Sequence, residues 1–311
     1  VPEITMLLAD AVEKTKTGKY ADFSMNEDER YELYIAGWLH DCGKVATPPH
    51  VVDKGMKLET ITDRIETVDT RFEVLKRDAE IDMLKKQVKL LKNGNANGAI
   101  EKTEVSFNDQ INKLTDEQEF IQKTNRGGEF MEKEDQQRVA DIGKYKWVSQ
   151  GKKINFLDEK EVRNLQIPKG TLLPEEREII NDHIVITIEM LEQLPYPKNL
   201  RNVPEFAGGH HEKMDGTGYP KGLNQSQMST QAKIMAIADI YEALTAADRP
   251  YKEGKKLSQA MRIMGFMKND FHIDEDLFEI FVTSGIYKQY AKEYIAKDQI
   301  DDVDEQSVIG K

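Results

Sequence analysis

Four of the six histidines in this chain stand in contexts that favour metal binding. They lie on the inward side of expected helices or beside glycines, and they are His40, His183, His210 and His211. A single histidine on an apolar helix face is more often an ordinary core residue, because imidazole is readily part-buried. Four such residues, together with Asp41 and Asp239, favour a shared metal centre instead.

Asp239 gives the sharpest single indication of a metal. It stands inside the apolar stretch IMAIADIY, where an unpaired carboxylate would cost several kcal/mol to desolvate. A metal ion is the simplest partner, because no cation adjoins it in the sequence, and histidine with carboxylate suits iron, manganese, zinc and related divalent ions. His210 and His211 are adjacent and must project in different directions, so each can serve a different ion. The pattern therefore favours two metals.

Helices are expected to position these side chains. Residues 26–41 predict a helix that Asn26 caps, with acidic residues in its first turn and His40 on its inner face. Residues 174–194 predict a second helix, which begins at Pro174 and turns His183 toward the core. Residues 229–247 predict a third, capped by Ser229 and apolar on nearly every face except at Asp239. The expected architecture is all-α.

A long charged segment separates His40 from His183. From residue 58 to residue 79 its apolar positions alternate steps of three and four, which predicts a coiled-coil seam. After a shift of phase the seam resumes with Ile81, Leu84, Val88 and Leu91. The glycines and asparagines of residues 93–98 permit a reversal, and a returning helix over about residues 101–140 would complete a long antiparallel hairpin. Charge-rich hairpins of this kind are usually solvated spacers or dimerisation arms.

Composition narrows the class of partner. The chain has 56 acidic and 44 basic residues and a net charge of −12, which argues against duplex nucleic acid. Its apolar runs fall short of the roughly 18 residues of a spanning helix, and its one cysteine, Cys42, fits a reducing cytoplasm. The chain starts at Val1 without a methionine, so we expect a soluble fragment of a longer protein.

Several short motifs follow one another in order along the chain. They are His40-Asp41-Cys42-Gly43-Lys44, His210-His211-Glu212, Asp215-Gly216-Thr217-Gly218-Tyr219-Pro220, the stretch at residues 236–245, and Asp248-Arg249-Pro250-Tyr251. Over roughly residues 1–57 and 160–290 the chain resembles the HD-GYP branch of the HD-domain phosphohydrolases. The resemblance implies an HD-domain helical bundle formed by residues 1–57 and 156–311. The coiled-coil hairpin of residues 58–155 would be an insertion in it.

The resemblance implies a centre of two or three divalent transition-metal ions, iron or manganese. Its ligands would be His40, Asp41, His183, His210, His211 and Asp239, with Asp41 bridging two ions. A water shared between the ions would lose its proton near neutral pH and attack phosphorus, while the ions neutralise charge on the phosphoryl oxygens. Lys44 would stabilise that charge or protonate the leaving oxygen, and its alternative is an ordinary surface lysine.

A cyclic dinucleotide is the substrate that the resemblance implies. Its binding residues would be Asp215, Gly218, Tyr219, Pro220, Arg249 and Lys252. Tyr219 would stack on a guanine or shape the backbone, although the loop could be only a tight turn. Arg249 and Lys252 would supply the local positive charge that the chain lacks overall, and Arg249 could equally form a buried ion pair.

Two features depart from the family pattern. In the family a helix upstream of the HD pair supplies a further histidine, and this chain begins at the valine that would follow it, so one ligand is expected upstream of Val1. The long insertion resembles one found in a subgroup of membrane-anchored sensors. We therefore expect a cytoplasmic domain of a protein with an upstream sensor region and a membrane anchor, and a homodimer formed through the hairpin.

Three classes of function compete. The leading hypothesis is hydrolysis of cyclic di-GMP to linear pGpG and then GMP in bacterial second-messenger signalling, with cyclic GMP-AMP as the alternative substrate. The second is a catalytically weak or inactive cyclic-dinucleotide receptor whose hairpin transmits the bound state to a partner. The third is a di-iron oxygenase or nucleotide phosphohydrolase of the wider superfamily, which would share the ligands but has no reason to carry the DGTGYP loop.

Overall fold

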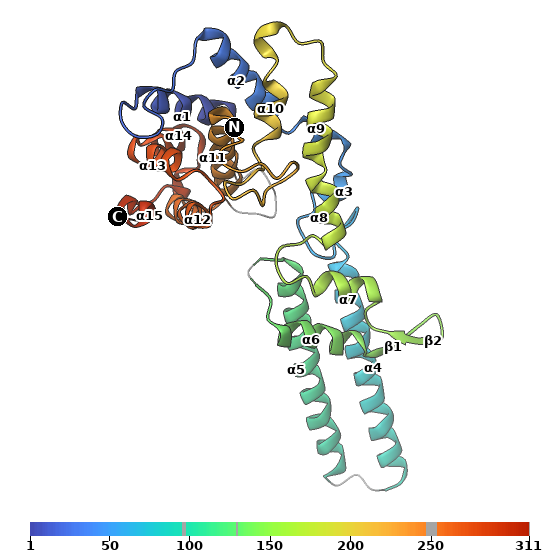
Figure 1. Cartoon of the computed structure of the whole chain (residues 1–311). Helices are drawn as coiled ribbons and strands as arrows, with labels where there is room; N and C mark the ends of the chain where they lie inside the picture. Colours follow the sequence, from blue (N-terminus) through green and yellow to red (C-terminus); the bar gives the residue numbers. More distant parts are fainter. Residues whose placement is uncertain (95–97, 129, 247–253, 311) are drawn as a thin grey trace. The chain divides into compact units, whose positions relative to one another are not determined.

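A computed structural model of the chain describes residues 1–94, 98–128, 130–246 and 254–310 (Figure 1). The described residues are mostly helical and contain one two-stranded sheet, so the predicted all-α class is confirmed. The chain divides into two compact units. The first unit joins Val1–Pro48 to Glu178–Lys311, and the second is Pro49–Arg177. Among the described helices, none has both the length and the apolar character that crossing a membrane requires.

The first unit is a bundle of helices around a single large apolar core. Its N-terminal part forms α1 (Pro2–Lys14), α2 (Glu27–Leu39) and the 3-10 helix η1 (Cys42–Ala46). Its C-terminal part forms α9 (His183–Glu192), η2 (Lys198–Leu200), α10 (Val203–Gly208), α11 (Thr230–Thr245), α12 (Leu257–Asn269), α13 (Glu275–Thr283), α14 (Ile286–Tyr294), η3 (Lys297–Gln299) and α15 (Glu305–Ile309). Helix α11 is central, because α1, α10, α12 and α13 all pack against it.

The predicted starts of two site-bearing helices are confirmed. Asn26 caps α2 through a reciprocal pair of hydrogen bonds, in which its side chain accepts from the Glu29 amide and the Glu29 carboxylate accepts from the Asn26 amide. The Ser229 hydroxyl accepts from the amide of Ala232 and caps α11. These local caps fix where each helix begins, and hence which residues of α2 and α11 face the core.

The prediction of one continuous helix over residues 174–194 is wrong. The segment forms α8 (Pro174–Asn181) and α9, with a break at Asp182. The side chain of His183 explains the break, because its Nδ1 donates to the carbonyl of Ile180. In an uninterrupted helix that carbonyl would accept from the amide four residues later, that of Ile184.

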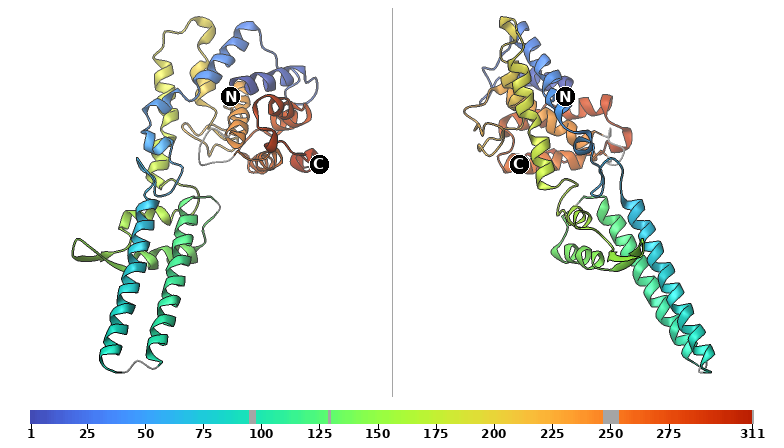
Figure 2. Two further views of the ribbon diagram at one scale, coloured as in Figure 1. Left: turned by 180° about the vertical axis from the view of Figure 1, so that it is seen from behind. Right: turned by 90° about the vertical axis from the view of Figure 1, so that its right-hand side faces the viewer.

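The second unit is built on a pair of long antiparallel helices, α4 (Ile65–Lys92) and α5 (Ala99–Asn125), which lie side by side in both views of Figure 2. Polar contacts along the pair fix its register: Lys76 reaches Gln118 near the middle, and Gln87 reaches Glu104 nearer the turn. The remaining elements are α3 (Pro49–Val52), α6 (Lys133–Gly143), β1 (Lys146–Ser149), β2 (Lys152–Asn155) and α7 (Glu159–Leu165).

The two halves of α4 differ in burial. In the first half Val68, Phe72 and Ala79 are buried, as the predicted seam requires. The prediction that the seam continues in the second half of α4 is wrong, because Ile81, Leu84, Val88 and Leu91 are between 45% and 58% exposed. An α-helix continues at 3.6 residues per turn through the phase shift in the apolar pattern, so the apolar residues after the shift no longer face α5. Whether the pair supercoils as a coiled coil stays a prediction. The prediction that Ile61 belongs to the seam is also wrong, because this residue precedes α4 and is exposed.

The returning helix is shorter than predicted, because α5 ends at Asn125 and α6 begins only at Lys133. Gly127 and Gly128 lie between them with φ of +61° and +156°, a backbone conformation that ends a helix. The compact units also divide the chain at other residues than the predicted domains. Phe156 and Leu165 lie in the core of the second unit, so its boundary falls at 177/178 and not at 155/156. The assignment of catalysis to residues 1–57 and 156–311 stays a prediction.

Candidate metal centre

All six predicted metal ligands meet within the first unit. His40 follows the last residue of α2, and Asp41 comes directly after it. His183 is the first residue of α9, and Asp239 lies within α11. His210 and His211 follow the end of α10. Ends of helices and one buried helix therefore bring these side chains together from segments far apart in the sequence.

The ligand atoms form two groups, in each of which all atoms lie within 4.8 Å of one another. One group consists of Asp41, His183, His210 and His211, and the other of His40, His210 and Asp239. His210 belongs to both. A mixed set of imidazole nitrogens and carboxylate oxygens at this spacing is suited to divalent transition metals, and the two groups offer donors for more than one ion.

Three of the histidines are oriented by the same local contact. Each directs Nδ1 at the backbone carbonyl three residues earlier: His40 at Gly37 (2.8 Å), His210 at Ala207 (2.6 Å), and His183 at Ile180. A carbonyl only accepts, so in the neutral ring Nδ1 carries the proton and Nε2 has the free lone pair. Such a contact is what commonly fixes a metal-binding histidine, because it sets both the tautomer and the ring plane.

Several of the inward atoms lack a hydrogen bond. His40 Nε2, His210 Nε2 and Asp41 Oδ1 are buried and make no hydrogen bond, and the nearest charged neighbours of His40 Nε2 and Asp41 Oδ1 are themselves members of the cluster at 3.2 and 3.1 Å. His211 Nε2 lies 3.3 Å from His183 Nε2. Buried polar atoms without partners are costly and rare, and a shared cation would satisfy all of them at once. The residues present therefore fit a metal centre.

The charges of the cluster without metal follow from burial and proximity. Burial alone lowers the pKa of His40, but the carboxylates of Asp239 and Asp41 outweigh it and raise that pKa to about 9. Burial raises the pKa of Asp239, and the neighbouring His40 and His210 more than reverse this, which leaves it at about 2. Burial and the adjacent His210 lower the pKa of His211 to about 3. Without metal, the cluster thus holds an ionised Asp239 beside a protonated His40 and a neutral His211, and His40 must lose its proton when it binds a metal.

A close approach between η1 and α9 sets the distance from Asp41 to His183. The amide of Gly43 donates to the Thr187 hydroxyl at 2.9 Å. A Cβ added at Gly43 would lie 2.1 Å from the carbonyl oxygen of His183, so only glycine fits there. Asp41 Oδ1 then lies 3.1 Å from His183 Nε2. The sequence placed Gly43 in a motif but gave no sign of this packing role.

Lys44 lies beside the cluster. Its Nζ is 2.6 Å from Asp41 Oδ2, and its side chain is 39% exposed. The ammonium group thus sits next to a predicted ligand and remains open to solvent. This position is compatible with the predicted role toward a substrate, which stays a prediction.

The glycine-rich loop folds back against the cluster. The ring of Tyr219 stacks on that of His211, with centroids 4.9 Å apart and planes at 19°, and its amide donates to the His211 carbonyl. A Cβ at Gly218 would lie 2.4 Å from the backbone nitrogen of Lys213, so glycine permits the loop to close. The buried carboxylate of Glu212 accepts from the amides of Lys221 (2.7 Å) and Leu223 (2.8 Å). Sequence reasoning assigned Glu212 no role, although it stands between the histidine pair and the loop.

The other predicted substrate residues have mixed outcomes. Asp215 accepts hydrogen bonds from the amide and hydroxyl of Thr217, so its carboxylate shapes the loop. Pro220 follows Tyr219 through a cis peptide bond. Arg249 and Lys252 lie outside the described residues.

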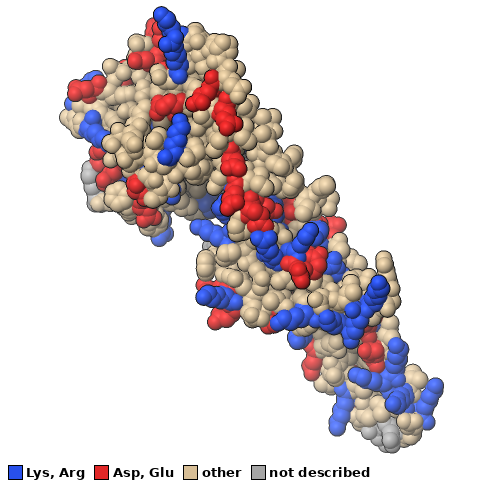
Figure 3. Space-filling view, turned by 45° about the vertical axis from the view of Figure 1, so that its right-hand side comes forward, with Lys and Arg blue, Asp and Glu red and all other residues tan. Residues whose placement is uncertain are grey.

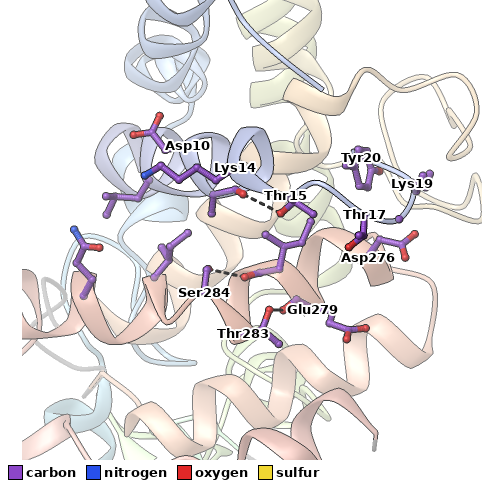
Figure 4. Close-up of a pocket in the computed structure, with 16 residues that line it drawn as sticks. Asp10, Lys14, Thr15, Thr17, Lys19, Tyr20, Asp276, Glu279, Thr283 and Ser284 are labelled. Carbon is purple, nitrogen blue, oxygen red and sulfur yellow. Dashed lines mark hydrogen bonds between the residues drawn. The ribbon is translucent and has the colours of Figure 1, made fainter. Parts of the chain in front are cut away.

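A cavity of about 770 Å³ lies elsewhere in the first unit, between the end of α1, the loop that follows it, α13 and α14 (Figure 4). Hydroxyls and charges of both signs line it, among them Lys14, Thr15, Tyr20, Asp276 and Ser284. None of the six predicted ligands lines this cavity, so it is not the mouth of the cluster.

Parts of the sequence match a known protein family and several characterised proteins. Residues 160–277 match the model of the HD domain family. A cyclic di-GMP phosphodiesterase of Pseudomonas aeruginosa is 47% identical over 79 residues, which cover 25% of this chain and 18% of the relative. A cyclic di-GMP phosphodiesterase of Thermotoga maritima is 40% identical over 93 residues, 30% of this chain and 25% of the relative. A 3'3'-cGAMP-specific phosphodiesterase of Vibrio cholerae is 39% identical over 95 residues, which cover 30% of this chain and 21% of the relative.

The helical bundle, the histidine and aspartate cluster and the match over residues 160–277 make this part of the chain similar to an HD domain. The names of the matched relatives support an HD phosphohydrolase of the HD-GYP type. The matched segments span only a fifth to a quarter of the length of these relatives. The His40-Asp41 pair precedes residues 160–277, and the second unit separates the two in sequence.

Proposed function

We propose that this chain hydrolyses a cyclic dinucleotide phosphodiester with the help of divalent metal ions. The substrate is cyclic di-GMP, cut first to linear pGpG and then to GMP, in bacterial second-messenger signalling. The observation that carries the proposal is the convergence of six imidazole and carboxylate side chains, among which three buried inward atoms make no hydrogen bond. The names of the relatives in Pseudomonas aeruginosa and Thermotoga maritima support the choice of substrate.

Each residue of the cluster has a part in this proposal. His40, Asp41, His183, His210, His211 and Asp239 hold the ions. Asp41 is the proposed bridge, because its two oxygens lie 3.2 Å from His40 Nε2 and 3.1 Å from His183 Nε2. Bound divalent ions supply an acidified water and neutralise phosphoryl charge. Lys44, free to turn from Asp41 toward solvent, stabilises negative charge on the substrate or protonates the leaving oxygen.

The loop at residues 212–223 supplies the substrate site. Tyr219 presents an aromatic ring beside His211, which is suited to stack on a guanine. Asp215, Gly218 and Pro220 shape that loop around the ring, and Arg249 and Lys252 bind phosphate or base. Iron or manganese is the proposed metal, two ions in this chain and a third where an upstream histidine is present.

Cyclic GMP-AMP is the second candidate substrate. The name and 39% identity of the Vibrio cholerae relative favour it to a similar degree. Competition between the two dinucleotides in one assay separates these candidates, because a specific enzyme consumes one of them first. Equal turnover would contradict either exclusive assignment.

Other features of the whole protein stay proposals. They are a cytoplasmic catalytic domain in a membrane-anchored protein, an upstream sensor region, and homodimerisation through the hairpin. The oligomeric state in solution, measured by light scattering, tests the last of these.

The deciding experiment pairs metal analysis with product analysis. Protein purified without chelators should contain about two metals per chain. With manganese or ferrous iron it should convert cyclic di-GMP to a linear dinucleotide, and Asp41→Ala should abolish both metal and turnover. The same assay on a chain extended upstream of Val1 shows whether a further ligand is needed. Metal and dinucleotide binding without product in both forms would replace the hydrolase by a receptor.

A further inference from the structure

The turn end of the α4–α5 hairpin is basic in an otherwise acidic chain. We define this free end as residues 81–94 and 98–105. Residues 83–100 contain four lysines and no aspartate or glutamate, whereas the chain as a whole carries a charge of −12. The lysines are Lys85, Lys86, Lys89 and Lys92, all exposed on α4. Figure 3 shows Lys and Arg side chains gathered at this end of the hairpin.

Ion pairing changes along α4. In its first half Arg71, Lys76 and Arg77 each have a carboxylate partner, namely Glu161, Glu73 and Glu80. At the free end, by contrast, none of the four lysines lies within 4.0 Å of a carboxylate oxygen among the described residues. Glu104 of α5 does make a contact across the helix pair, but it accepts a hydrogen bond from Gln87 and not from a lysine. The carboxylates of the free end itself, on Asp82, Glu101 and Glu104, therefore leave these four lysines without an ion pair among the described residues.

Apolar exposure changes at the same place. Ile81, Leu84, Val88 and Leu91 follow one another at steps of three and four, so they form one stripe along the helix, and Val105 on α5 is exposed as well. Lys85 and Lys92 fall directly beside this stripe at 100° per residue. Figure 2 shows α6, α7, β1 and β2 toward the other end of the hairpin. Ile81 and Lys85 line a cavity with Trp147 and Val148 of β1, whereas Leu84, Val88 and Leu91 are between 48% and 58% exposed.

We propose that the free end of the hairpin docks on an anionic lipid surface. An apolar stripe flanked by lysines is the pattern of a helix that lies in the lipid headgroup region, with the aliphatic residues among acyl chains and the ammonium groups at the phosphates. The lysine stems reach sideways and keep their charges in the headgroup layer. The four aliphatic side chains lose their exposure without any partner protein.

At the free end, charge complementarity favours lipid over a second copy of the chain, so the proposed homodimer would form through another face of the hairpin. Two free ends packed stripe to stripe would bring their lysine rows together, and like charges in contact oppose association. A surface of anionic headgroups meets the same lysines with opposite charge. The attraction is electrostatic at long range, so it weakens as salt is raised.

Vesicle co-sedimentation of the whole chain tests the proposal. The probes are vesicles of phosphatidylcholine alone and of phosphatidylcholine mixed with phosphatidylglycerol. We expect binding to the mixed vesicles only, weaker at high salt. The double variant Lys85→Glu/Lys89→Glu should bind them about 30-fold or more weakly, since each lysine near an anionic surface contributes about fivefold. The triple variant Leu84→Ser/Val88→Ser/Leu91→Ser should also lose binding.

The matched control is Lys198→Glu/Lys297→Glu, which changes the net charge equally at exposed lysines of the first unit. This control should bind the mixed vesicles as the unchanged chain does, and circular dichroism should show that every variant is folded. Failure of the unchanged chain to bind mixed vesicles would overturn the proposal. Equal loss in the control would overturn it too. So would a dimer in light scattering that the triple variant abolishes, since the stripe would then be an interface between two copies.

Discussion

At the scale of single residues, hydrogen bonds to backbone carbonyls determine which ring nitrogen of each histidine faces the cluster. The carbonyls of Gly37, Ile180 and Ala207 each accept a hydrogen bond from Nδ1 of the histidine three positions later. The lone pairs on Nε2 are thereby aimed before any ion arrives. This arrangement reduces the reorganisation that binding requires.

Glu212 is predicted to be a positioning residue for the loop. In Glu212→Gln one of the two acceptor oxygens becomes an NH₂ group, which cannot accept from the amide of Lys221 or Leu223. We expect kcat/KM for the dinucleotide to fall by about 10-fold to 100-fold, mainly through KM, with metal content unchanged. Steady-state kinetics and metal analysis measure the two effects. Glu189→Gln, at an exposed site on α9, is the control and should change neither. Loss of metal from Glu212→Gln would instead make this glutamate a part of the metal centre.

All six predicted ligands lie together in the cluster, but the residues that hold them in place could not be predicted from the sequence. Asp239 could be found because a carboxylate in an apolar helix needs a cation, and the histidines because they recur in known motifs. Gly43 and Glu212 stand in the same motifs, yet their roles depend on which backbone atoms lie opposite them in space. Long-range packing of that kind leaves no periodic signal in a single sequence.

At the scale of elements, η1 and α9 pack so closely at Gly43 that no side chain fits between them. Gly43→Ala is predicted to lower the free energy of unfolding of the first unit by about 3 kcal/mol or more, because the new Cβ would overlap the carbonyl of His183. Metal content should fall with it. Gly18→Ala is a useful contrast: its Cβ meets open space, and its positive φ costs only about 1 kcal/mol. Denaturant unfolding compares the two, and equal losses would show that the joint tolerates a side chain.

Lys57 should make the stability of the second unit depend on pH. Burial lowers the pKa of Lys57 to about 8, and its ammonium group donates to the carbonyls of Leu165 and Ile167. In the unfolded chain the pKa returns to about 10.4. Between these values the unfolded state binds more protons, so the free energy of unfolding rises with pH in this window.

The comparison with Lys57→Met isolates this contribution. The difference in unfolding free energy between the unchanged chain and the variant should be flat below about pH 8 and grow in favour of the unchanged chain toward about pH 10. Thermal unfolding at a series of pH values measures it. Parallel curves for the two proteins would show that Lys57 keeps an ordinary pKa.

Elements were predicted well where a cap or a period defined them and poorly where tertiary contacts intervened. Asn26 and Ser229 gave the starts of α2 and α11 because capping is local. The break between α8 and α9 depends on His183 taking a backbone carbonyl. The apolar stripe from Ile81 to Leu91 misled the seam prediction, because periodicity alone does not say which side of a helix finds a partner.

At the scale of the whole molecule, each compact unit has an apolar core of its own, but the predicted metal ligands all belong to the first unit. Manganese is therefore expected to stabilise the first unit selectively, by about 2.7 kcal/mol at a concentration 100 times its dissociation constant. Calorimetry with manganese and with chelator should move one unfolding transition and leave the other. His210→Ala should remove the response, because His210 belongs to both ligand groups. A shift of both transitions together would mean that the units unfold as one.

The ligand set is divided by the second unit in the order of the chain. His40 and Asp41 precede the segment between α4 and α5, and His183, His210, His211 and Asp239 follow it. A cut between these two helices would give two polypeptides, neither of which carries the complete cluster. The two pieces share the apolar core of the first unit and the α4–α5 contact. This chain is thus a natural candidate for a split protein, in which metal would bind only when both fragments are expressed together.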